Sequence, residues 1–472
     1  MDFLHNWKKK AYLCNMGTGQ FGTGQFGTKR KKDMDFYGRR GEIERLQDIM
    51  QLSYEHAQFT VITGRRRIGK TRLVLKAYEG VPMLYFFVAR KAENVLCDEY
   101  VAMIEDVLGL HVHGRIETFA EVFSLLMDEA SRQHITLFID EFQEFSRINS
   151  SIYSDMQRIW DLNKDKAHIN LLVCGSVNSL MNDIFRDSKE PLYGRQTQFM
   201  HVKAFKPSVL CEILGNYHPK YTAEDLLALY SFTGGVAKYV EYFIDNKKYT
   251  RKSMIDFMLR EDSLFIGEGK AMLIEEFGKE YGVYFTILSL IAEGTNTRAA
   301  LNDILRRELS GYLTRLDDDY GLISKRQPLF ELSANKNLCY QLDDNFLLFW
   351  FRFIYKYHYL IEIGSFGKLR EVVERDYPVV SGFMLERYFR EKLIATQQFT
   401  RIGSWWDRKG ENEIDLIAID DLSHTATFYE IKRKASKIAL TLLERKKDIF
   451  LSSTHELKGY TITCQALSME DM

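Results

Sequence analysis

The most informative residues of this chain are Gly64-Arg65-Arg66-Arg67-Ile68-Gly69-Lys70-Thr71. They follow the apolar run Phe59-Thr60-Val61-Ile62-Thr63 and precede a helical pattern that extends to about Tyr78. Glycines at this spacing let backbone N–H groups curl around an anion at the N-terminus of a helix. A strand, a glycine-rich loop and a helix in this order therefore predict a phosphate-binding loop rather than a chance match in a turn.

The residues that end this loop predict the ligand. Lys70 is placed to pair with the β- and γ-phosphates of a nucleotide, and the Thr71 hydroxyl to ligate Mg²⁺. Asp140 ends the apolar strand Ile135–Ile139, where a carboxylate reaches the Mg²⁺ shell, and Glu141 beside it can orient or deprotonate an attacking water. We expect ATP and Mg²⁺ as ligands and ATP hydrolysis as the reaction.

Two further residues are weaker candidates for the same site. Ser176 follows the apolar strand 169–174, where its hydroxyl either senses the γ-phosphate or caps the next helix. Arg195 ends the segment Pro191-Leu192-Tyr193-Gly194-Arg195 and is a candidate arginine finger, acting within the chain or from a neighbouring copy. An ordinary surface arginine is the alternative, and spacing alone does not decide between them.

Apolar runs alternate with helical patterns through this part of the chain. Four runs, 59–63, 83–88, 135–139 and 169–174, read as strands. Such a pattern predicts a parallel sheet covered by helices on both faces, hence the α/β class. From about residue 206 the pattern is helical and polar, with one break at Thr233-Gly234-Gly235.

The middle of the chain predicts a winged helix. Three short helical patterns begin near Tyr284 and are followed by the strand-like segment Cys339–Leu342. The third helix carries Asp317-Asp318-Asp319, which repels phosphates. DNA reading by this helix and a hinge or protein-contact role therefore both remain open, and the second is favoured.

The C-terminal part of the sequence carries three carboxylates and a lysine on successive predicted elements. Glu386 lies on a helical pattern, Asp415 within the alternating strand 413–418, and Glu430-Ile431-Lys432 at the end of another strand. Residues i and i+2 of a strand share a face, so Glu430 and Lys432 point the same way. Asp415 and Glu430 can hold Mg²⁺ with oxygen ligands, and Lys432 can orient a metal-bound water for attack on a phosphodiester. A solvated face is the alternative explanation of the Glu-x-Lys pattern. Nearby positive charge for a phosphate backbone comes from Arg433, Lys434 and Lys437.

Two resemblances follow from these motifs. The order of the N-terminal motifs resembles the archaeal-type ATPases, a branch of the signal-transduction ATPases with numerous domains. The segments that carry it are Phe36–Arg39, Asp140–Gln143, Gly175-Ser176, Pro191–Arg195, Thr233–Tyr239 and Leu348–Phe353. This chain departs from the family at Ala237, where a proline is usual, which weakens a nucleotide-sensing role for that turn. The set Glu386, Asp415, Glu430 and Lys432 resembles the PD-(D/E)xK nucleases, in a C-terminal domain of the DUF234 type with Trp405-Trp406 before the acidic strand.

Composition excludes several classes. The net charge of −1 gives no global basic field, so any contact with DNA must be local. The cysteines are scattered without a CxxC pair, which argues against a zinc knuckle and for free thiols in the cytoplasm. Neither an apolar run long enough to span a membrane nor a secretion signal is present.

Together these observations predict a cytoplasmic protein in five parts. They are a disordered tail with a GTGQFGT repeat (1–33), a P-loop ATPase core (34–205), a helical lid (206–275), a winged helix (276–360) and a small α/β nuclease-like domain (361–472). The tail reads alternatively as an extension upstream of Met34. We expect the nucleotide state to control a metal-dependent domain that cleaves or binds DNA. The alternative is a nucleotide-dependent assembly switch with a silent C-terminal domain. DNA and further copies of the chain are the candidate partners besides ATP.

Overall fold

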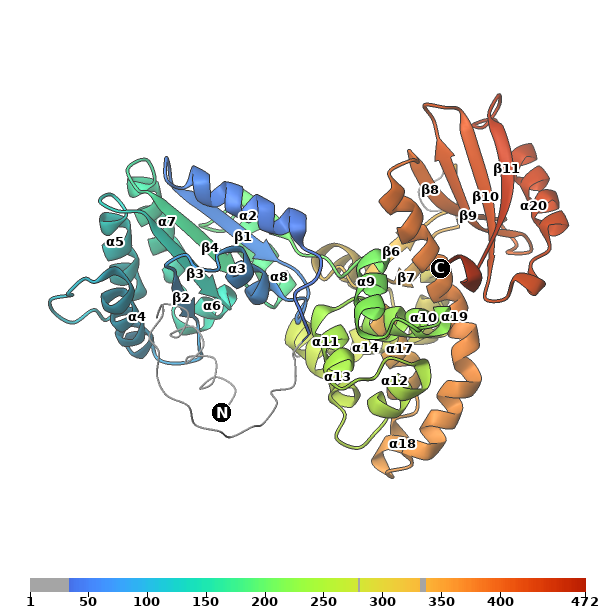
Figure 1. Ribbon diagram of the computed structural model, residues 1–472, viewed down its shortest axis with the longest axis horizontal. Coiled ribbons are helices and arrows are strands. Elements are labelled where there is room, and N and C mark those ends of the chain that lie inside the picture. The colour runs from blue at the N-terminus through green and yellow to red at the C-terminus, as the bar shows by residue number, and fades with distance from the viewer. Residues whose placement is uncertain (1–33, 279–280, 332–336) are drawn as a thin grey trace. The chain divides into compact units, whose positions relative to one another are not determined.

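The computed structural model describes residues 34–278, 281–331 and 337–472 (Figure 1). Its described residues divide into two compact units, one of residues 39–203 and one of residues 34–38 and 204–472. The predicted tail, with its repeat, lies outside the described residues. Residues 34–38, expected in the ATPase core, belong to the second unit, where Met34 N donates to Asp245 Oδ1 at 2.8 Å.

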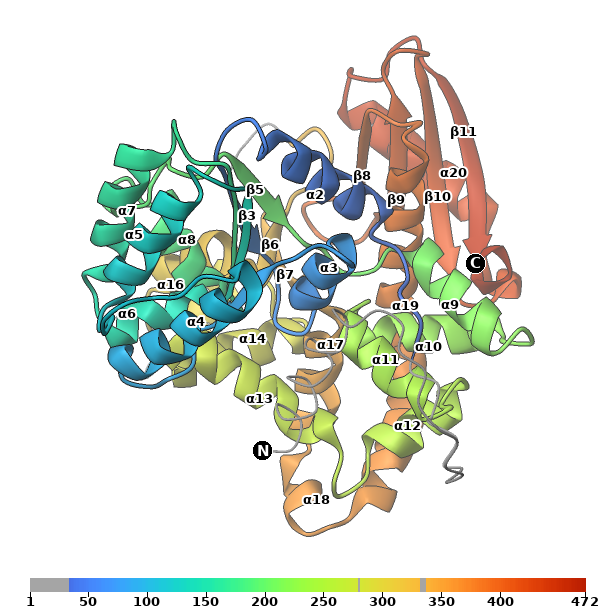
Figure 2. The same ribbon diagram turned by 60° about the vertical axis from the view of Figure 1, so that its left-hand side comes forward.

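The first unit is built on a five-stranded parallel sheet in the order β2-β3-β4-β1-β5. All residues of β1, β3 and β4 are buried, because helices cover both faces. Figure 2 shows α4, α5 and α7 on one face and α2 and α3 on the other. The strands are β1 (Gln58–Thr63), β2 (Leu84–Phe87), β3 (Ile135–Asp140), β4 (Ile169–Cys174) and β5 (Gln198–His201). The helices are α2 (Arg40–Leu52), α3 (Lys70–Ala77), α4 (Glu93–Leu108), α5 (Phe119–Glu129), α6 (Phe145–Ile148), α7 (Ile152–Asn163) and α8 (Asn178–Arg186), with a 3₁₀ turn, η1 (Phe142–Glu144), before α6. The predicted α/β class with a parallel sheet is confirmed.

Parallel strands place all their carboxyl ends at one edge of the sheet. The loop after β1 and the acidic end of β3 therefore meet, although 69 positions separate Thr71 from Asp140 in the sequence. This edge carries the candidate nucleotide site.

The second unit begins with a run of helices. They are α9 (Pro207–Tyr217), α10 (Ala223–Thr233), α11 (Ala237–Asp245), α12 (Arg251–Met258) and α13 (Leu264–Phe277). Threonine hydroxyls cap α10 and α12 in capping boxes at Thr222 and Thr250. Between α10 and α11 the chain turns at Gly234 and Gly235, both in the left-handed region.

Gly235 is required by its surroundings, because its φ is +71° and a Cβ there would lie 2.5 Å from the Phe205 carbonyl oxygen. We expect Gly235→Ala to lower the free energy of unfolding by about 2–4 kcal/mol. Gly215, within α9, has open space on its side-chain face, since a Cβ added there would meet no heavy atom within 4 Å. Gly215→Ala should therefore raise stability by about 0.5–1 kcal/mol. Urea denaturation of the two variants measures both; equal effects would contradict the assigned strain.

Three helical segments and a two-stranded antiparallel sheet follow. They are α14 (Tyr281–Glu293), α15 (Arg298–Leu305), α16 (Ser310–Thr314) continued by the π-helical turn η3 (Arg315–Asp319), β6 (Ile323–Arg326) and β7 (Cys339–Leu342). The acidic run lies in η3, where Lys325 of β6 pairs with Asp317 at 2.8 Å. Next come α17 (Asn345–Phe349), the π-helical η4 (Trp350–Tyr355) and α18 (His358–Glu362).

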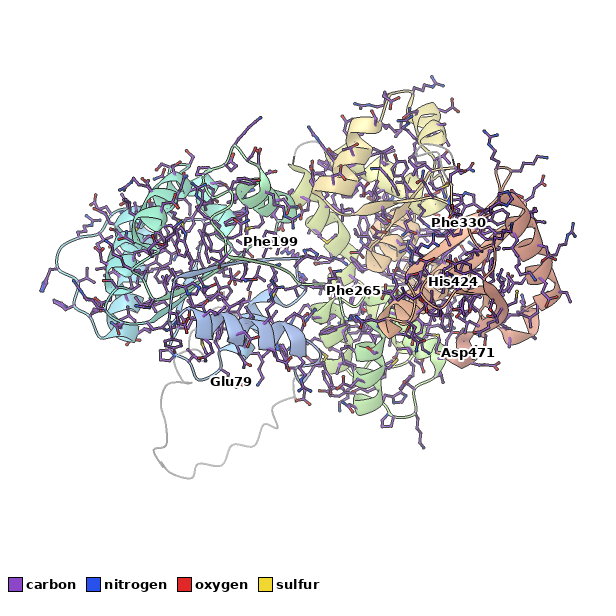
Figure 3. All side chains as sticks on the ribbon, turned by 90° about the horizontal axis from the view of Figure 1, so that it is seen from above. Glu79, Phe199, Phe265, Phe330, His424 and Asp471 are labelled. Carbon is purple, nitrogen blue, oxygen red and sulfur yellow. The ribbon has the colours of Figure 1, made fainter. Side chains whose placement is uncertain are left out.

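The C-terminal part is a four-stranded sheet in the order β11-β10-β9-β8, with β10 and β11 parallel and the other pairs antiparallel. Its elements are α19 (Phe366–Thr396), β8 (Arg401–Trp406), β9 (Glu413–Asp420), β10 (Thr425–Lys432), η5 (Ala435–Lys437), α20 (Leu440–Ser453), β11 (Thr461–Ser468) and η6 (Met469–Asp471). Phe428, Leu443 and Phe450 are among the buried side chains of its core. Phe330, labelled in Figure 3, packs against this core from the segment after β6. No helix among the described residues is long and apolar enough to cross a membrane.

Candidate functional sites

The loop between β1 and α3 closes around the side chain of Lys70. Lys70 is buried, and its Nζ donates to the carbonyl oxygens of Gly64 at 2.8 Å and Arg65 at 3.2 Å. Gly64 has a φ of +139°, and a Cβ there would lie 2.5 Å from the Val202 carbonyl oxygen. The conformation of the loop therefore requires glycine at position 64. In this conformation the loop carbonyl oxygens surround the Lys70 ammonium.

The rest of the loop is held by a turn within it and by a contact from Arg39. Ile68 is buried and closes a turn by donating its N–H to Arg65 O at 3.3 Å, while Arg66 and Arg67 complete the loop before Gly69. Arg39, in the residues just before α2, donates from Nη2 to the Ile68 carbonyl oxygen at 3.5 Å. Sequence reasoning placed Arg39 in a family motif but gave it no contact with the loop.

Thr71 and Asp140 meet at the edge of the sheet. Thr71 Oγ1 donates to Asp140 Oδ2 at 2.8 Å, and Tyr85 on β2 donates to the same oxygen at 3.0 Å. The Cys174 thiol and the Glu141 N–H donate to Asp140 Oδ1 at 2.8 and 3.0 Å. Burial and the Asp140 carboxylate raise the pKa values of the Tyr85 hydroxyl and the Cys174 thiol, so both groups stay protonated donors. A hydroxyl and a carboxylate this close fit the hard oxygen ligands that Mg²⁺ prefers.

Glu141 is held beside this pair in a strained backbone conformation. Its φ is +58°, unusual for a residue other than glycine. Gln143 Nε2 and Ser176 Oγ donate to its Oε2 at 2.6 and 2.7 Å. Ser176 therefore joins the site through Glu141. Val177, rather than Ser176, occupies the N-cap position of α8, and that cap has no side-chain hydrogen bond.

Arg195 does not lie with these residues. It precedes β5 and therefore sits at the amino edge of the parallel sheet, opposite the edge that carries the loop. Its Nη2 pairs with Asp161 of α7 at 3.2 Å, and its Nη1 donates to the Tyr193 carbonyl oxygen at 2.8 Å. Arginine-finger action of Arg195 on the loop of its own chain is thus wrong. Arg195 also lines a cavity of about 590 Å³ with Trp160, Asp161 and Lys164.

In the second unit, Asp415, Glu430 and Lys432 come together. The regular pairing of β9 with β10 ends at Leu416 and Tyr429, and the Asp415 carboxylate then accepts the N–H of Ile431 at 2.7 Å. Lys432 Nζ lies 2.9 Å from Asp415 Oδ2 and 3.0 Å from Glu430 Oε1. Burial lowers the pKa of Lys432, but the two carboxylates outweigh it and the net shift is upward, so the ammonium is charged at neutral pH. The convergence that the sequence predicted is present.

Two more carboxylates face this cluster. Burial raises the pKa of Glu386 on α19 to about 8, and the Asp415 and Glu413 carboxylates add to the shift. The pKa of Glu413 is raised in the same way, by burial and then by Asp415. Within the described residues no group of three or more His, Cys, Asp or Glu side chains is close enough to hold a metal ion. Mg²⁺ is usually held by one or two carboxylates together with water and phosphate oxygens, and Asp415 and Glu430 are the two carboxylates that Lys432 joins here.

Sequence reasoning missed two cations of this cluster. Lys446 on α20 lies 3.3 Å from Glu430 Oε2. Arg326 of β6 lowers the pKa values of Glu386 and Glu413, opposing their burial. Lys446 lies on a helix and Arg326 on a strand far upstream. No spacing in the sequence therefore indicates that either residue approaches the carboxylates.

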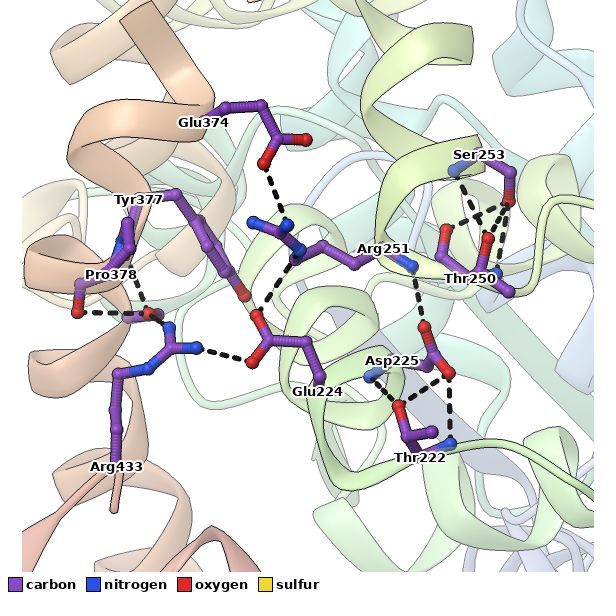
Figure 4. Close-up of polar contacts among 11 residues, drawn as sticks. Thr222, Glu224, Asp225, Thr250, Arg251, Ser253, Glu374, Tyr377, Pro378 and Arg433 are labelled. Atoms are coloured by element: carbon purple, nitrogen blue, oxygen red, sulfur yellow. Dashed lines mark hydrogen bonds and ion pairs between the residues drawn. The ribbon is translucent and has the colours of Figure 1, made fainter. Parts of the chain in front are cut away.

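Arg433, expected to face a phosphate backbone, is instead tied to helices. Figure 4 shows its guanidinium paired with Glu224 of α10. The guanidinium also donates to the Ser381 hydroxyl of α19. Arg251 of α12 approaches the other oxygen of Glu224 at 3.4 Å and pairs with Glu374 at 2.8 Å. The charge of Arg433 is thus neutralised within the chain, which contradicts the predicted phosphate contact.

The raised pKa of Glu386 predicts a pH dependence of stability in the metal-free protein. Between about pH 4.5 and 8 the native state keeps a proton that the unfolded chain has lost, so the free energy of unfolding falls as pH rises. Glu386→Gln removes this loss, and its stability relative to wild type should grow by roughly 1–3 kcal/mol across that range and then level off. Urea denaturation in EDTA at about pH 5, 7 and 9 measures it. Glu362→Gln, at an exposed position on α18, should give a constant offset; a constant offset for Glu386→Gln would contradict the assignment.

Two family models match separate stretches of the chain. A family model described as an ATPase domain predominantly from Archaea matches residues 36–243, and a model of archaeal and bacterial proteins of unknown function, DUF234, matches residues 350–446. An uncharacterized protein of Methanocaldococcus jannaschii is 30% identical over 412 residues, which cover 85% of this chain and 88% of that protein. A Walker-type ATPase of Pyrococcus abyssi has a solved structure with a TM-score of 0.52 at 19% identity, covering 67% of this chain and 96% of that one.

The fold and the loop geometry define the first unit as the nucleotide-binding domain of a P-loop ATPase. The chain belongs to the family of ATPases found predominantly in Archaea, in the form that carries a DUF234 C-terminal domain. The family resemblance predicted from the sequence is thereby confirmed.

Proposed function

We propose that the first unit binds ATP with Mg²⁺ and hydrolyses it. Lys70 holds the β- and γ-phosphates, and Thr71 and Asp140 hold the metal ion. Glu141, oriented by Gln143 and Ser176, positions the attacking water. The observation that supports this assignment is the 2.8 Å contact between Thr71 and Asp140 at the edge where the loop curls around Lys70.

We propose further that the nucleotide state controls the C-terminal domain, which cleaves DNA with a divalent metal ion. Asp415 and Glu430 would hold the ion, with Glu386 beside them, and the ion would supply an activated water that Lys432 would orient for attack on the phosphodiester. The support is the convergence of Lys432 with both carboxylates within 3.0 Å. The helices α14 to α16 with the β6–β7 pair have the element order of a winged helix, and we assign its acidic third helical segment, where Asp317 is paired, to protein contact rather than to DNA reading.

The test compares wild type with Lys70→Ala and Lys432→Ala in cleavage of plasmid and linear DNA, with Mg²⁺ or Mn²⁺ and with or without ATP. Cleavage that is lost in Lys432→Ala and loses its ATP dependence in Lys70→Ala supports the proposal. An absence of cleavage by wild type under every condition overturns the nuclease part. A release of phosphate from ATP that Lys70→Ala does not affect overturns the ATPase assignment.

A nucleotide-dependent assembly switch with a silent C-terminal domain is the second candidate. It is favoured by the position of the Lys432 ammonium between Asp415 and Glu430, where it offsets part of their negative charge. Arg195 lies at the amino edge of its sheet, so an arginine-finger role would require the site of another copy; its ion pair with Asp161 equally fits an ordinary surface arginine. Light scattering with ATP and with ADP tests it: a change of mass that Arg195→Ala removes, together with no effect of Asp415→Ala, supports the switch.

A further inference from the structure

Arg326 reaches the C-terminal cluster from outside its sheet. It ends β6, and its Nη2 donates to Ser404 Oγ on β8 at 2.9 Å. Its guanidinium carbon lies 5.5 Å from the centroid of the Trp406 ring. Trp406 is the register partner of Glu413 on β9, so the arginine sits at the end of the sheet where the carboxylates gather.

The segment after Arg326 is fixed against the same strand. Leu329 N donates to the Ser404 carbonyl oxygen at 2.9 Å, and a Cβ on Gly403 would lie 2.6 Å from Leu329 Cγ. β8 is the edge strand of the four-stranded sheet, and this segment pairs with part of its open side. Arg326 is therefore held by its own hydrogen bond and by the residues that follow it.

The chemistry of the side chain fits an anion better than it fits a purely structural contact. A guanidinium offers five N–H donors in a planar fork that matches phosphate oxygens. Among the described residues Ser404 is the hydrogen-bond partner of this side chain, through Nη2 alone, and the guanidinium carbon lies over the Trp406 ring. Lys432, by contrast, is held between Asp415 and Glu430.

We propose that Arg326 is a phosphate-contacting residue of the C-terminal site, and that the β6–β7 pair thereby forms part of that site. Its ligand is the phosphodiester backbone of a nucleic acid whose neighbouring phosphate lies at the metal ion. This inference rests on the proposed metal-dependent action on DNA. Arg326 would contact the substrate although it lies outside the sequence motifs of the C-terminal domain.

This role of Arg326 predicts that its replacement changes the affinities for Mn²⁺ and for DNA in opposite directions. Arg326 repels a cation bound among the carboxylates, so Arg326→Gln should tighten Mn²⁺ binding roughly 3- to 10-fold. The same change removes a charged donor from the phosphate, so binding of a fluorescein-labelled duplex in EDTA should weaken roughly 5- to 30-fold. The slope of log Kd against log salt should fall by about one.

The experiment measures Mn²⁺ binding by titration calorimetry and duplex binding by fluorescence anisotropy on the full chain. Arg326→Lys keeps the charge without the fork, so it should restore the wild-type Mn²⁺ affinity but only part of the affinity for DNA. Lys325→Gln is the matched control, because it removes one positive charge at the preceding position, where the side chain pairs with Asp317. Thermal denaturation of each variant establishes that it is folded.

Opposite shifts in Arg326→Gln, absent from Lys325→Gln, support the proposal. A weakening of both ligands together marks Arg326 as a structural anchor and overturns it, as does no change in either. If wild type binds Mn²⁺ and DNA but Arg326→Gln equals it, the inference fails while the proposed function stands. If wild type binds neither probe, the proposed function fails first and the inference falls with it.

Discussion

Lys70→Ala is expected to reduce the rate of ATP hydrolysis by about 10²- to 10³-fold, the range found when one preorganised donor is removed from developing negative charge. The lysine is buried in the curve of its loop, and Nζ is already fixed on the Gly64 and Arg65 carbonyl oxygens. These two hydrogen bonds hold the ammonium inside the curve of the loop, where the proposed β- and γ-phosphates would bind. Phosphate release measured under saturating ATP gives the rate, and binding of a labelled nucleotide shows whether affinity falls as well.

The matched control is Lys76→Ala on the same helix. Lys76 is half exposed and pairs with Glu79 at 2.5 Å, away from the loop. Its replacement should change hydrolysis by less than about twofold, since exposed ion pairs contribute little. Equal losses in the two variants would show that the effect comes from damage to α3 rather than from the site.

Asp415→Asn is expected to lower DNA cleavage at least about 100-fold. The amide oxygen can still accept the Ile431 N–H, so the end of the pairing between β9 and β10 is preserved. The variant removes the negative charge that would hold the metal ion and that fixes Lys432 at 2.9 Å. Conversion of supercoiled plasmid with Mg²⁺ and with Mn²⁺ measures the rate.

Lys432→Ala should cause a loss of similar size. Lys458→Ala, at an exposed lysine of the same domain, should leave cleavage unchanged. Calorimetric titration of Mn²⁺ separates the roles, because Asp415→Asn should weaken binding of the ion and Lys432→Ala should bind it at least as tightly as wild type. Cleavage by Asp415→Asn within about threefold of wild type would place the chemistry elsewhere.

The arrangement of the candidate nucleotide site follows largely from the sequence, because the pattern that indicates it is local. Gly64, Gly69 and Lys70 belong to one turn, and the strands on either side are buried apolar runs. Asp140 joins them because parallel strands end at a common edge, so strand order alone is enough to place it. Arg39 and Gln143 require the folded chain, since neither contact follows from strand order.

The C-terminal part is predicted less completely. β9 and β10 carry clear alternation, but β8 with its two tryptophans and the largely exposed β11 are not predicted as strands. The helical pattern that carries Glu386 belongs to α19, which starts at Phe366 and runs through Pro378. A proline usually ends a helical pattern, and here packing on both sides of the helix overrides that preference. Arg326 and Lys446 come from other elements, so only tertiary contact brings them to the carboxylates.

α19 spans 31 residues, which corresponds to about 46 Å. Along it, Glu386 turns toward Asp415, while Arg387 binds the Leu342 carbonyl oxygen at 2.6 Å and Asn345 Oδ1 at 2.9 Å. Neighbouring residues of one helix thus contact two different parts of the second unit. Unfolding of either part would remove contacts that hold the helix against the other. The second unit should therefore unfold in one cooperative transition, and a fragment that begins after α18 should lack a stable fold even though it contains every strand of the C-terminal sheet.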